Sequence, residues 1–194
     1  MDQPNLIIIA GCNGAGKTTA AYKILSESLE GIEFVNADEI ARDLRIDNPN
    51  STDIEAGRIM LERMDTLLGL LESFAIETTL ASRSLMSLID DANSSNYKVR
   101  LIYFWLESPE LAVERVKSRV RHGGHNIPPL IIERRYHRGL RNLLNLYMPM
   151  IDDWVLYDNT KTMTEVIARR IAGGNIIVEN FSIFTKLIKA YGNG

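Results

Sequence analysis

The sequence has few residues that could form disulfides or zinc sites, and it has no long apolar segment. It has one cysteine, Cys12, in 194 residues, which excludes an internal disulfide. Its three histidines, His122, His125 and His137, do not match the spacing of a zinc site. Apolar runs such as 101–106 are too short to cross a bilayer, and the first residues lack the basic and long apolar regions of a signal peptide. We therefore expect a cytoplasmic protein with no membrane contact.

The net charge is small, but the charged residues are unevenly distributed. The formal net charge is −3, which argues against nucleic acid as a partner. Residues 115–141, however, hold eight of the 22 Lys and Arg and only one of the 25 acidic residues, so this segment carries +7 and the remainder −10. A compact basic segment in an acidic chain predicts a local site for an anion.

A phosphate-binding motif stands near the start of the chain. Residues 11–18 match G-x-x-x-x-G-K-[ST], the P-loop, after an apolar run at 6–10 and before a helical pattern at 18–29. Strand, glycine-rich turn and helix together favour a nucleotide site over an incidental turn. We expect Lys17 to reach the β- and γ-phosphates and the Thr18 hydroxyl to bind Mg²⁺. The residues expected to contact ATP here are Gly11, Asn13, Gly14, Ala15, Gly16, Lys17, Thr18 and Thr19.

Cys12 lies inside this motif and has two interpretations. It is either a small residue tolerated in the loop or, beside a helix N-terminus, a thiol of lowered pKa that is reactive when nucleotide is absent.

Strand and helix patterns alternate along the chain. Five β-like runs are expected at 6–10, 32–36, 73–79, 97–106 and 153–158, with helices between them and a further helix at 163–172. This order predicts an α/β P-loop NTPase fold, with a parallel five-stranded sheet flanked by helices and a helical lid typical of kinases. We expect one domain over 1–194, with a lid at 115–135 and a C-terminal strand and helix at 175–194. The apolar stripe of the helix at 52–72, Met60 and Met64 included, is expected in the core.

Polar residues follow the second and third expected strands. Asp38 comes just after the second strand, where it could serve function or simply cap the next helix. Glu77, Thr79 and Arg83 end or follow the third strand. Since the carboxyl ends of parallel strands share one edge of the sheet, we expect all four side chains to contact an acceptor there, with Arg83 pairing with an acceptor diphosphate.

The basic segment is expected to hold the phosphates. Arg119, Arg121 and either Arg134 or Arg135 are candidates, while Arg138 and Arg141 are assigned to the surface. A merely solvated helix face is the alternative, but acidic residues that would balance it are almost absent.

The ordered set of motifs resembles the zeta-toxin family of P-loop kinases. The resemblance rests on the P-loop, Val35-Asn36-Ala37-Asp38, Ile76-Glu77-Thr78-Thr79, Arg119 with Gly123-Gly124-His125, and Ile132-x-Arg134-Arg135-Tyr136. It implies a kinase that uses ATP and Mg²⁺ to phosphorylate the 3′-hydroxyl of a UDP-N-acetylamino sugar such as UDP-N-acetylglucosamine. The chain is shorter than the best-known toxins, and its Gly-Gly-His turn is typical of zeta-like proteins described only as ATPases or kinases.

The resemblance also implies roles for individual residues. Asp38 would take the acceptor proton, Glu77 and Thr79 would contact the acceptor sugar, and Arg119 with Arg134 or Arg135 would hold the transferring phosphate. Asn159 lies where related kinases pass the adenine. The implied partners are a small-molecule acceptor, namely a nucleotide sugar, and an antitoxin protein as a candidate.

A different class of function fits the P-loop alone. The chain could be an ATP-binding regulatory switch, or a toxin–antitoxin component without small-molecule kinase activity. Asp38 and Glu77 discriminate between the classes, because a switch needs neither an acceptor base nor an acceptor pocket. A transport-type ATPase is disfavoured, since we find no signature helix and no long apolar strand ending in an Asp-Glu pair.

Overall fold

The computed structural model describes residues 3–29, 31–47, 52–124 and 126–193. The loop expected at 48–51 and His125 of the Gly-Gly-His turn lie outside the described residues. Within them, no helix is both long and apolar enough to cross a membrane.

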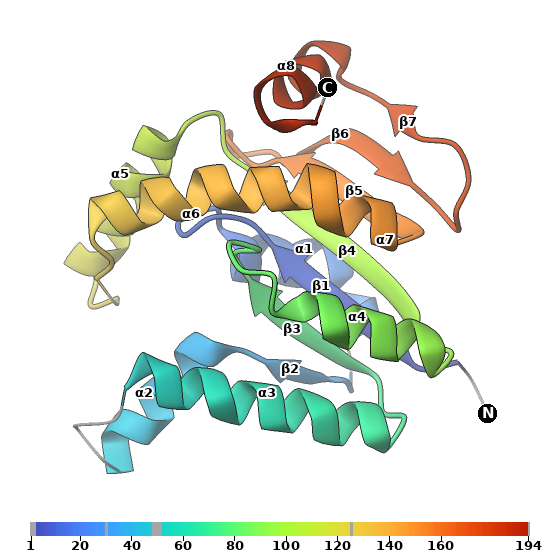
Figure 1. Ribbon diagram of the computed structural model, residues 1–194. Coiled ribbons are helices and arrows are strands. Elements are labelled where there is room, and N and C mark those ends of the chain that lie inside the picture. The colour runs from blue at the N-terminus through green and yellow to red at the C-terminus, as the bar shows by residue number, and fades with distance from the viewer. Residues whose placement is uncertain (1–2, 30, 48–51, 125, 194) are drawn as a thin grey trace.

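A single sheet forms the centre of the molecule (Figure 1). Its strands lie in the order β2-β3-β1-β4-β5-β6-β7, and the first five run parallel. These five confirm the expected strands: β1 Asn5–Ala10, β2 Glu33–Val35, β3 Phe74–Thr78, β4 Lys98–Trp105 and β5 Asp153–Asp158. The order brings the ends of β3 and β1 together, since Ile9 pairs with Glu77 and Ala10 with Thr78. The residues after these two strands therefore meet at one edge.

The sheet has seven strands, so the expectation of five is wrong. The predicted helix at 163–172 is instead β6, Glu165–Arg170, which runs antiparallel to β5 and is followed by β7, Ile177–Val178. Ala and Arg suit helices, but Ile167 and Ala168 become fully buried by pairing with β5. Tertiary pairing therefore overrides local propensity here.

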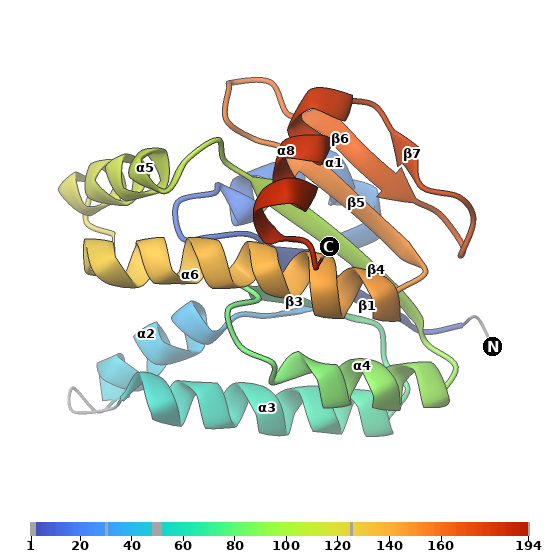
Figure 2. The ribbon, with the colours of Figure 1, turned by 45° about the horizontal axis from the view of Figure 1, so that its top comes forward.

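Helices cover both faces of the sheet, with α3, α4 and α6 in front of it and α1 behind it in Figure 1. The α8 helix packs on β6 and α6. Figure 2 shows α5 above the left-hand end of α6 and α2 below it, beyond the strand ends. The helices are α1 Lys17–Leu29, α2 Ala37–Asp47, α3 Asp53–Gly69, α4 Leu85–Ser94, α5 Pro109–Arg121, α6 Pro129–Asn142, the π-helix η1 Leu143–Tyr147, α7 Met148–Met150 and α8 Phe181–Tyr191.

Helix α6 lies directly over the end of β3. At Gly139 an added Cβ would lie 2.5 Å from the carbonyl oxygen of Thr79, so only glycine permits this approach. The Tyr136 hydroxyl donates a 2.7 Å hydrogen bond to the carbonyl oxygen of Leu106. The helical backbone of α6 continues to Met150 through the π-helix and α7. These contacts fix the arginine-rich first half of α6 above the strand ends.

Candidate functional site

The P-loop is pressed between β4 and α5. Gly11, Gly14 and Gly16 have φ values of 148°, 80° and 73°, which other residues rarely adopt. A Cβ at Gly11 would lie 2.5 Å from the carbonyl oxygen of Phe104, and one at Gly14 would lie 2.6 Å from that of Ala112. The glycines are therefore needed both for the turn and for its close packing.

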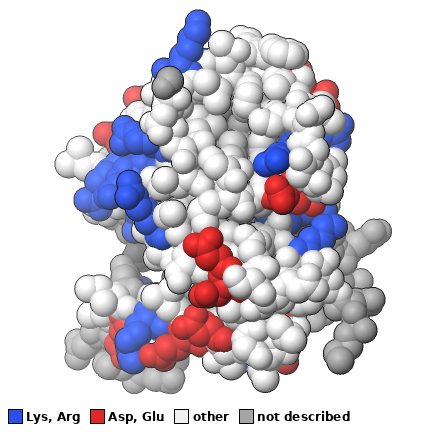
Figure 3. Space-filling model, turned by 45° about the vertical axis from the view of Figure 1, so that its right-hand side comes forward, with Lys and Arg blue, Asp and Glu red and all other residues white. Residues whose placement is uncertain are grey.

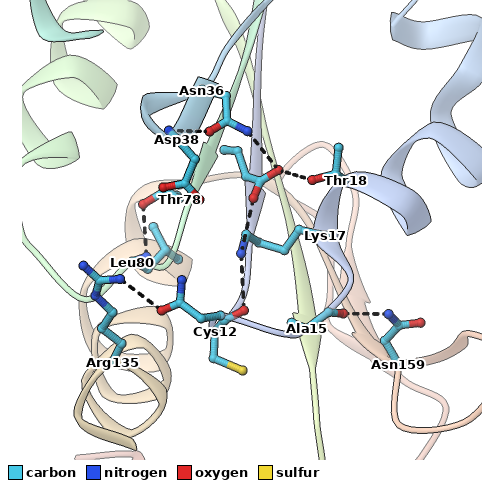
Figure 4. Close-up of polar contacts among 12 residues, drawn as sticks. Cys12, Ala15, Lys17, Thr18, Asn36, Asp38, Thr78, Leu80, Arg135 and Asn159 are labelled. Atoms are coloured by element: carbon cyan, nitrogen blue, oxygen red, sulfur yellow. Dashed lines mark hydrogen bonds and ion pairs between the residues drawn. The ribbon is translucent and has the colours of Figure 1, made fainter. Parts of the chain in front are cut away.

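Lys17 folds back over this loop. Its Nζ donates to the carbonyl oxygen of Cys12 at 3.2 Å and lies 3.4 Å from Oε1 of Glu77 (Figure 4). Only 7% of the residue is exposed. An ammonium so buried requires a partner, which Glu77 supplies. The side chain is thus held at the mouth of the loop.

Glu77 connects the loop to the third strand. The Thr18 hydroxyl donates to Oε2 of Glu77 at 2.6 Å, and Nδ2 of Asn36 approaches the same oxygen at 3.4 Å. A hydroxyl oxygen and a carboxylate oxygen at this spacing are ligands that suit Mg²⁺. Among the described residues, no three His, Cys, Asp or Glu side chains gather into a metal site. A metal ion would thus depend on Thr18, Glu77 and the phosphates of a nucleotide.

The Asp38 carboxylate does not cap helix α2. The backbone N–H of Asp38 donates to Oδ1 of Asn36 at 2.9 Å, so Asn36 is the residue that caps α2. The Asp38 side chain is exposed and lines three adjoining cavities. Sequence reasoning missed Asn36, although an Asn directly before a helical pattern is itself a cap signal.

The largest of these cavities lies between the P-loop and α3, and we call it the acceptor cavity. Its volume is about 510 Å³. Its polar wall includes Lys17, Asp38, Glu77 and Thr79, and its apolar wall includes Ile54, Met60, Leu61, Met64 and Leu85. Met60 and Met64 are buried as predicted, but they also form part of this wall.

Arg83 does not reach the acceptor cavity. It is exposed in the turn before α4 and is absent from the residues that line this space, whereas Ser84 and Leu85 line it. The structure therefore separates Arg83 from Asp38, Glu77 and Thr79, which it brings together.

The expected arginines occupy different positions. Arg135 is half-buried, and its Nη1 donates to Oδ1 of Asn13 in the P-loop at 3.1 Å. Arg134 is exposed and lines a cavity of about 410 Å³ that Arg135 and Asp38 also line. Arg119 lines a third cavity, of about 480 Å³, again with Asp38, and Arg121 is exposed at the last residue of α5. Among the hydrogen bonds given for the described residues, the one that joins these arginines to the P-loop comes from Arg135.

The loop after β5 closes the other side of the P-loop. Nδ2 of Asn159 donates to the carbonyl oxygen of Ala15 at 2.7 Å, and Thr164 donates to Oδ1 of Asn159 at 2.7 Å. The Arg115 guanidinium donates to the carbonyl oxygens of Asn159 and Thr160 at 3.0 and 2.7 Å. Asn159 therefore lies beside the nucleotide loop, and its contact with adenine stays a prediction. Arg115 is a structural support that the sequence did not reveal.

Burial decides between the two interpretations of Cys12. The residue is 2% exposed, and desolvation raises the pKa of its thiol to about 11, although Lys17 acts in the opposite direction. Burial therefore supports the first interpretation, a small residue tolerated in the loop, and contradicts the lowered pKa of the second, because Cys12 belongs to the core cluster.

Charged side chains gather in patches on the surface. Figure 3 shows one face with a large group of Lys and Arg at the left, a group of Asp and Glu lower down, and residues of both signs next to one another at the right.

Comparisons with known proteins place this site in a family. An uncharacterized protein of Haemophilus influenzae is 30% identical over 135 residues, which cover 69% of this chain and 94% of that protein. A chain of the AvrRxo1-ORF1:-ORF2 complex with ATP has the same fold, with a TM-score of 0.74 at 21% identity over 95% of this chain. This chain matches only 63% of that longer one.

A chain of the PezAT toxin–antitoxin system of Streptococcus pneumoniae gives a TM-score of 0.63 at 21% identity, over 84% of this chain and 72% of that one. At such identities the two structures show likeness of fold alone. The family model described as zeta toxin matches residues 1–170, which include the P-loop, Asp38, Glu77 and the helices α5 and α6. The chain therefore belongs to the zeta toxin family.

Proposed function

We propose that this protein is a kinase that transfers the γ-phosphate of ATP to a hydroxyl group of a small acceptor. The observation that carries the proposal is the position of Asp38, which lines the acceptor cavity with Lys17 and Glu77. Its carboxylate is not needed to cap α2, because Asn36 supplies that cap. An ATP-driven switch would have no need of a carboxylate placed in such a cavity.

The proposed mechanism divides the work between neutralising charge and positioning the acceptor. Lys17 and Arg135 neutralise the phosphates, since both lie at the P-loop. Thr18 and Glu77 would hold Mg²⁺, which would supply further neutralisation of the triphosphate. Asp38 accepts the proton of the attacking hydroxyl as the new P–O bond forms. The bond between the γ-phosphorus and the β–γ bridging oxygen breaks in the same transfer, and ADP leaves.

The proposal differs from the expectation for Glu77. Sequence resemblance makes this residue an acceptor contact, whereas its hydrogen bond from Thr18 and its ion pair with Lys17 support a role on the metal side. Thr79 and the apolar wall of α3 are left to contact the acceptor. Residues 115–135 are proposed to close over the triphosphate as a lid, with the turn at Gly123, where φ is 85°, as its hinge.

The proposed acceptor is a UDP-N-acetylamino sugar. A cavity with one polar wall and one apolar wall suits a sugar ring, which presents hydroxyl groups on its rim and C–H groups on its faces. The choice among such acceptors rests on membership of the zeta toxin family.

The test combines the protein with Mg²⁺-ATP and UDP-N-acetylglucosamine and seeks a phosphorylated product by mass spectrometry. A product formed by the wild type and absent with Asp38→Asn supports the proposal. Phosphorylation of a free sugar or nucleoside instead would keep the kinase and reject this acceptor. ATP binding with no transfer to any acceptor of a broad panel would favour an antitoxin-controlled protein without small-molecule kinase activity, an alternative supported by the fold shared with the PezAT system.

A further inference from the structure

The face of α2 that carries Asp38 also carries two arginines. Asp38, Arg42 and Arg45 follow one another at i, i+4 and i+7, which places them on the same side of the helix. All three line the cavity of about 480 Å³, whose opposite wall is formed by Arg119 and Gly124 at the end of α5. This cavity, which we call the arginine cleft, lies between α2 and the proposed lid.

The arginine cleft adjoins the reaction centre. Asp38 lines the acceptor cavity, the arginine cleft and a third cavity, and Ala41 lines the last two. A ligand that follows α2 from Lys17 would therefore pass Asp38 and reach the arginine cleft between α2 and α5. Helix α2 rises by about 1.5 Å per residue, so Arg42 and Arg45 lie roughly 6 and 10 Å beyond Asp38 along its axis.

The arginine cleft is lined by more positive than negative side chains. Three guanidinium groups line the arginine cleft with two carboxylates, Asp38 and Glu39. Asp43 lies 3.4 Å from Nε of Arg42, but both side chains are well exposed, and such pairs contribute little. Guanidinium groups are well suited to phosphate oxygens, because their planar donors bind two oxygens at once.

From this arrangement we infer that Arg42, Arg45 and Arg119 bind a phosphate or diphosphate group of the acceptor, one to two helical turns from the hydroxyl that Asp38 deprotonates. The inference rests on the proposed kinase function and deepens it. It assigns to these residues the anion contact that sequence reasoning gave to Arg83. It also moves Arg119 from the transferring phosphate to the acceptor.

Binding measurements test the inference without requiring turnover. The P-loop is first saturated with Mg²⁺ and a non-hydrolysable ATP analogue, and UDP, UDP-N-acetylglucosamine or inorganic phosphate is then titrated by calorimetry. The variant is Arg42→Gln with Arg45→Gln. Its control, Arg138→Gln with Arg141→Gln, removes the same charge from the exposed side of α6.

Wild type and control should bind at least one of these probes, and the α2 variant should bind it about tenfold or more weakly. Neutral N-acetylglucosamine should bind all three proteins alike. Equal affinity of the variant and the control for the phosphate-bearing probes would overturn the inference, as would the failure of all of these probes to bind the wild type.

Kinetics separate this inference from the kinase proposal. Arg119→Gln should raise the KM for the acceptor and leave kcat and the KM for ATP near wild type. A loss of kcat at saturating acceptor would instead put Arg119 on the transferring phosphate. If UDP-N-acetylglucosamine binds through these arginines but is not phosphorylated, the arginine cleft stands and the proposed acceptor fails. If the α2 variant phosphorylates it at an unchanged KM, the kinase stands and the arginine cleft fails.

Discussion

The Thr18 hydroxyl donates a 2.6 Å hydrogen bond to Oε2 of Glu77, across the gap between the start of α1 and the end of β3. The two residues are 59 positions apart in the chain, and the pairing of β1 with β3 brings them together. The remaining carboxylate oxygen of Glu77 lies beside Lys17. One carboxylate thus contacts both the residue expected to bind the metal and the residue expected to bind the phosphates.

Glu77→Gln should raise the Mg²⁺ concentration needed for half-maximal transfer by about 10- to 100-fold, because the amide cannot replace a carboxylate beside the metal. Titrating Mg²⁺ at saturating ATP and acceptor measures this. Glu72→Gln, an exposed position just before β3, is the control. If Mg²⁺ dependence is unchanged and the acceptor KM rises, Glu77 is an acceptor contact, as the sequence resemblance implies.

Asp38→Asn should keep ATP affinity and reduce transfer by about 10²- to 10⁴-fold, which is the range expected for loss of a general base. The helix should persist because Asn36, not Asp38, supplies its cap. Single-turnover rates and ATP binding on the same preparation separate the two effects, with the exposed Asp65→Asn as the control. A rate within a few-fold of wild type would remove Asp38 from the chemistry.

Arg135→Gln should impair transfer more than Arg134→Gln, because Arg135 is half-buried and donates a hydrogen bond to Asn13 in the P-loop, whereas Arg134 is exposed. We expect a fall in kcat of about 10²- to 10³-fold for Arg135, as is typical when one charge-stabilising donor is lost. Comparing ADP and ATP affinity shows whether the loss concerns the γ-phosphate. Equal rates for the two variants would contradict the assignment.

Cys12 should resist alkylation by iodoacetamide in the folded protein at pH 8 and react once the protein is unfolded. The pKa of its thiol is raised to about 11 in the folded state, whereas the pKa of the thiol in the unfolded chain is about 8.5. The neutral thiol therefore contributes stability below about pH 8.5, and that contribution is lost as the pH rises toward 11.

Urea unfolding of wild type and Cys12→Ala between pH 8 and 10.5 measures this loss. The wild type should lose more of its free energy of unfolding over this range than the variant does. Rapid alkylation of the folded protein at pH 8 would contradict the burial of the sulfur.

Local patterns were enough to predict the P-loop and the five parallel strands. Runs such as Leu6–Ala10 are apolar and β-branched on both faces, and this pattern is typical of a strand buried between helices. The segment that forms β6 has no such signal, because its strand character comes from pairing with β5. A single sequence carries the propensity of a segment and not the partner that overrides it.

The site was predicted less completely for the same reason. Asp38 and Asn36 both stand where a cap can form, and only the backbone geometry decides between them. Arg135 and Asn13 are 122 residues apart, so their contact follows from where α6 packs on Thr79 and not from either motif. Residue types at the sheet edge were predictable, but their pairing was not.

The close approach of Gly11 to the carbonyl oxygen of Phe104 has a consequence for genetics. The floor of the nucleotide loop is the end of a core strand, so any substitution that shifts β4 also displaces the loop. A mutational survey scored by activity alone would then report buried positions such as Phe104 and Leu106 as if they touched the nucleotide. Such a survey needs a parallel measure of folded protein abundance before its sensitive positions can be drawn as a binding surface.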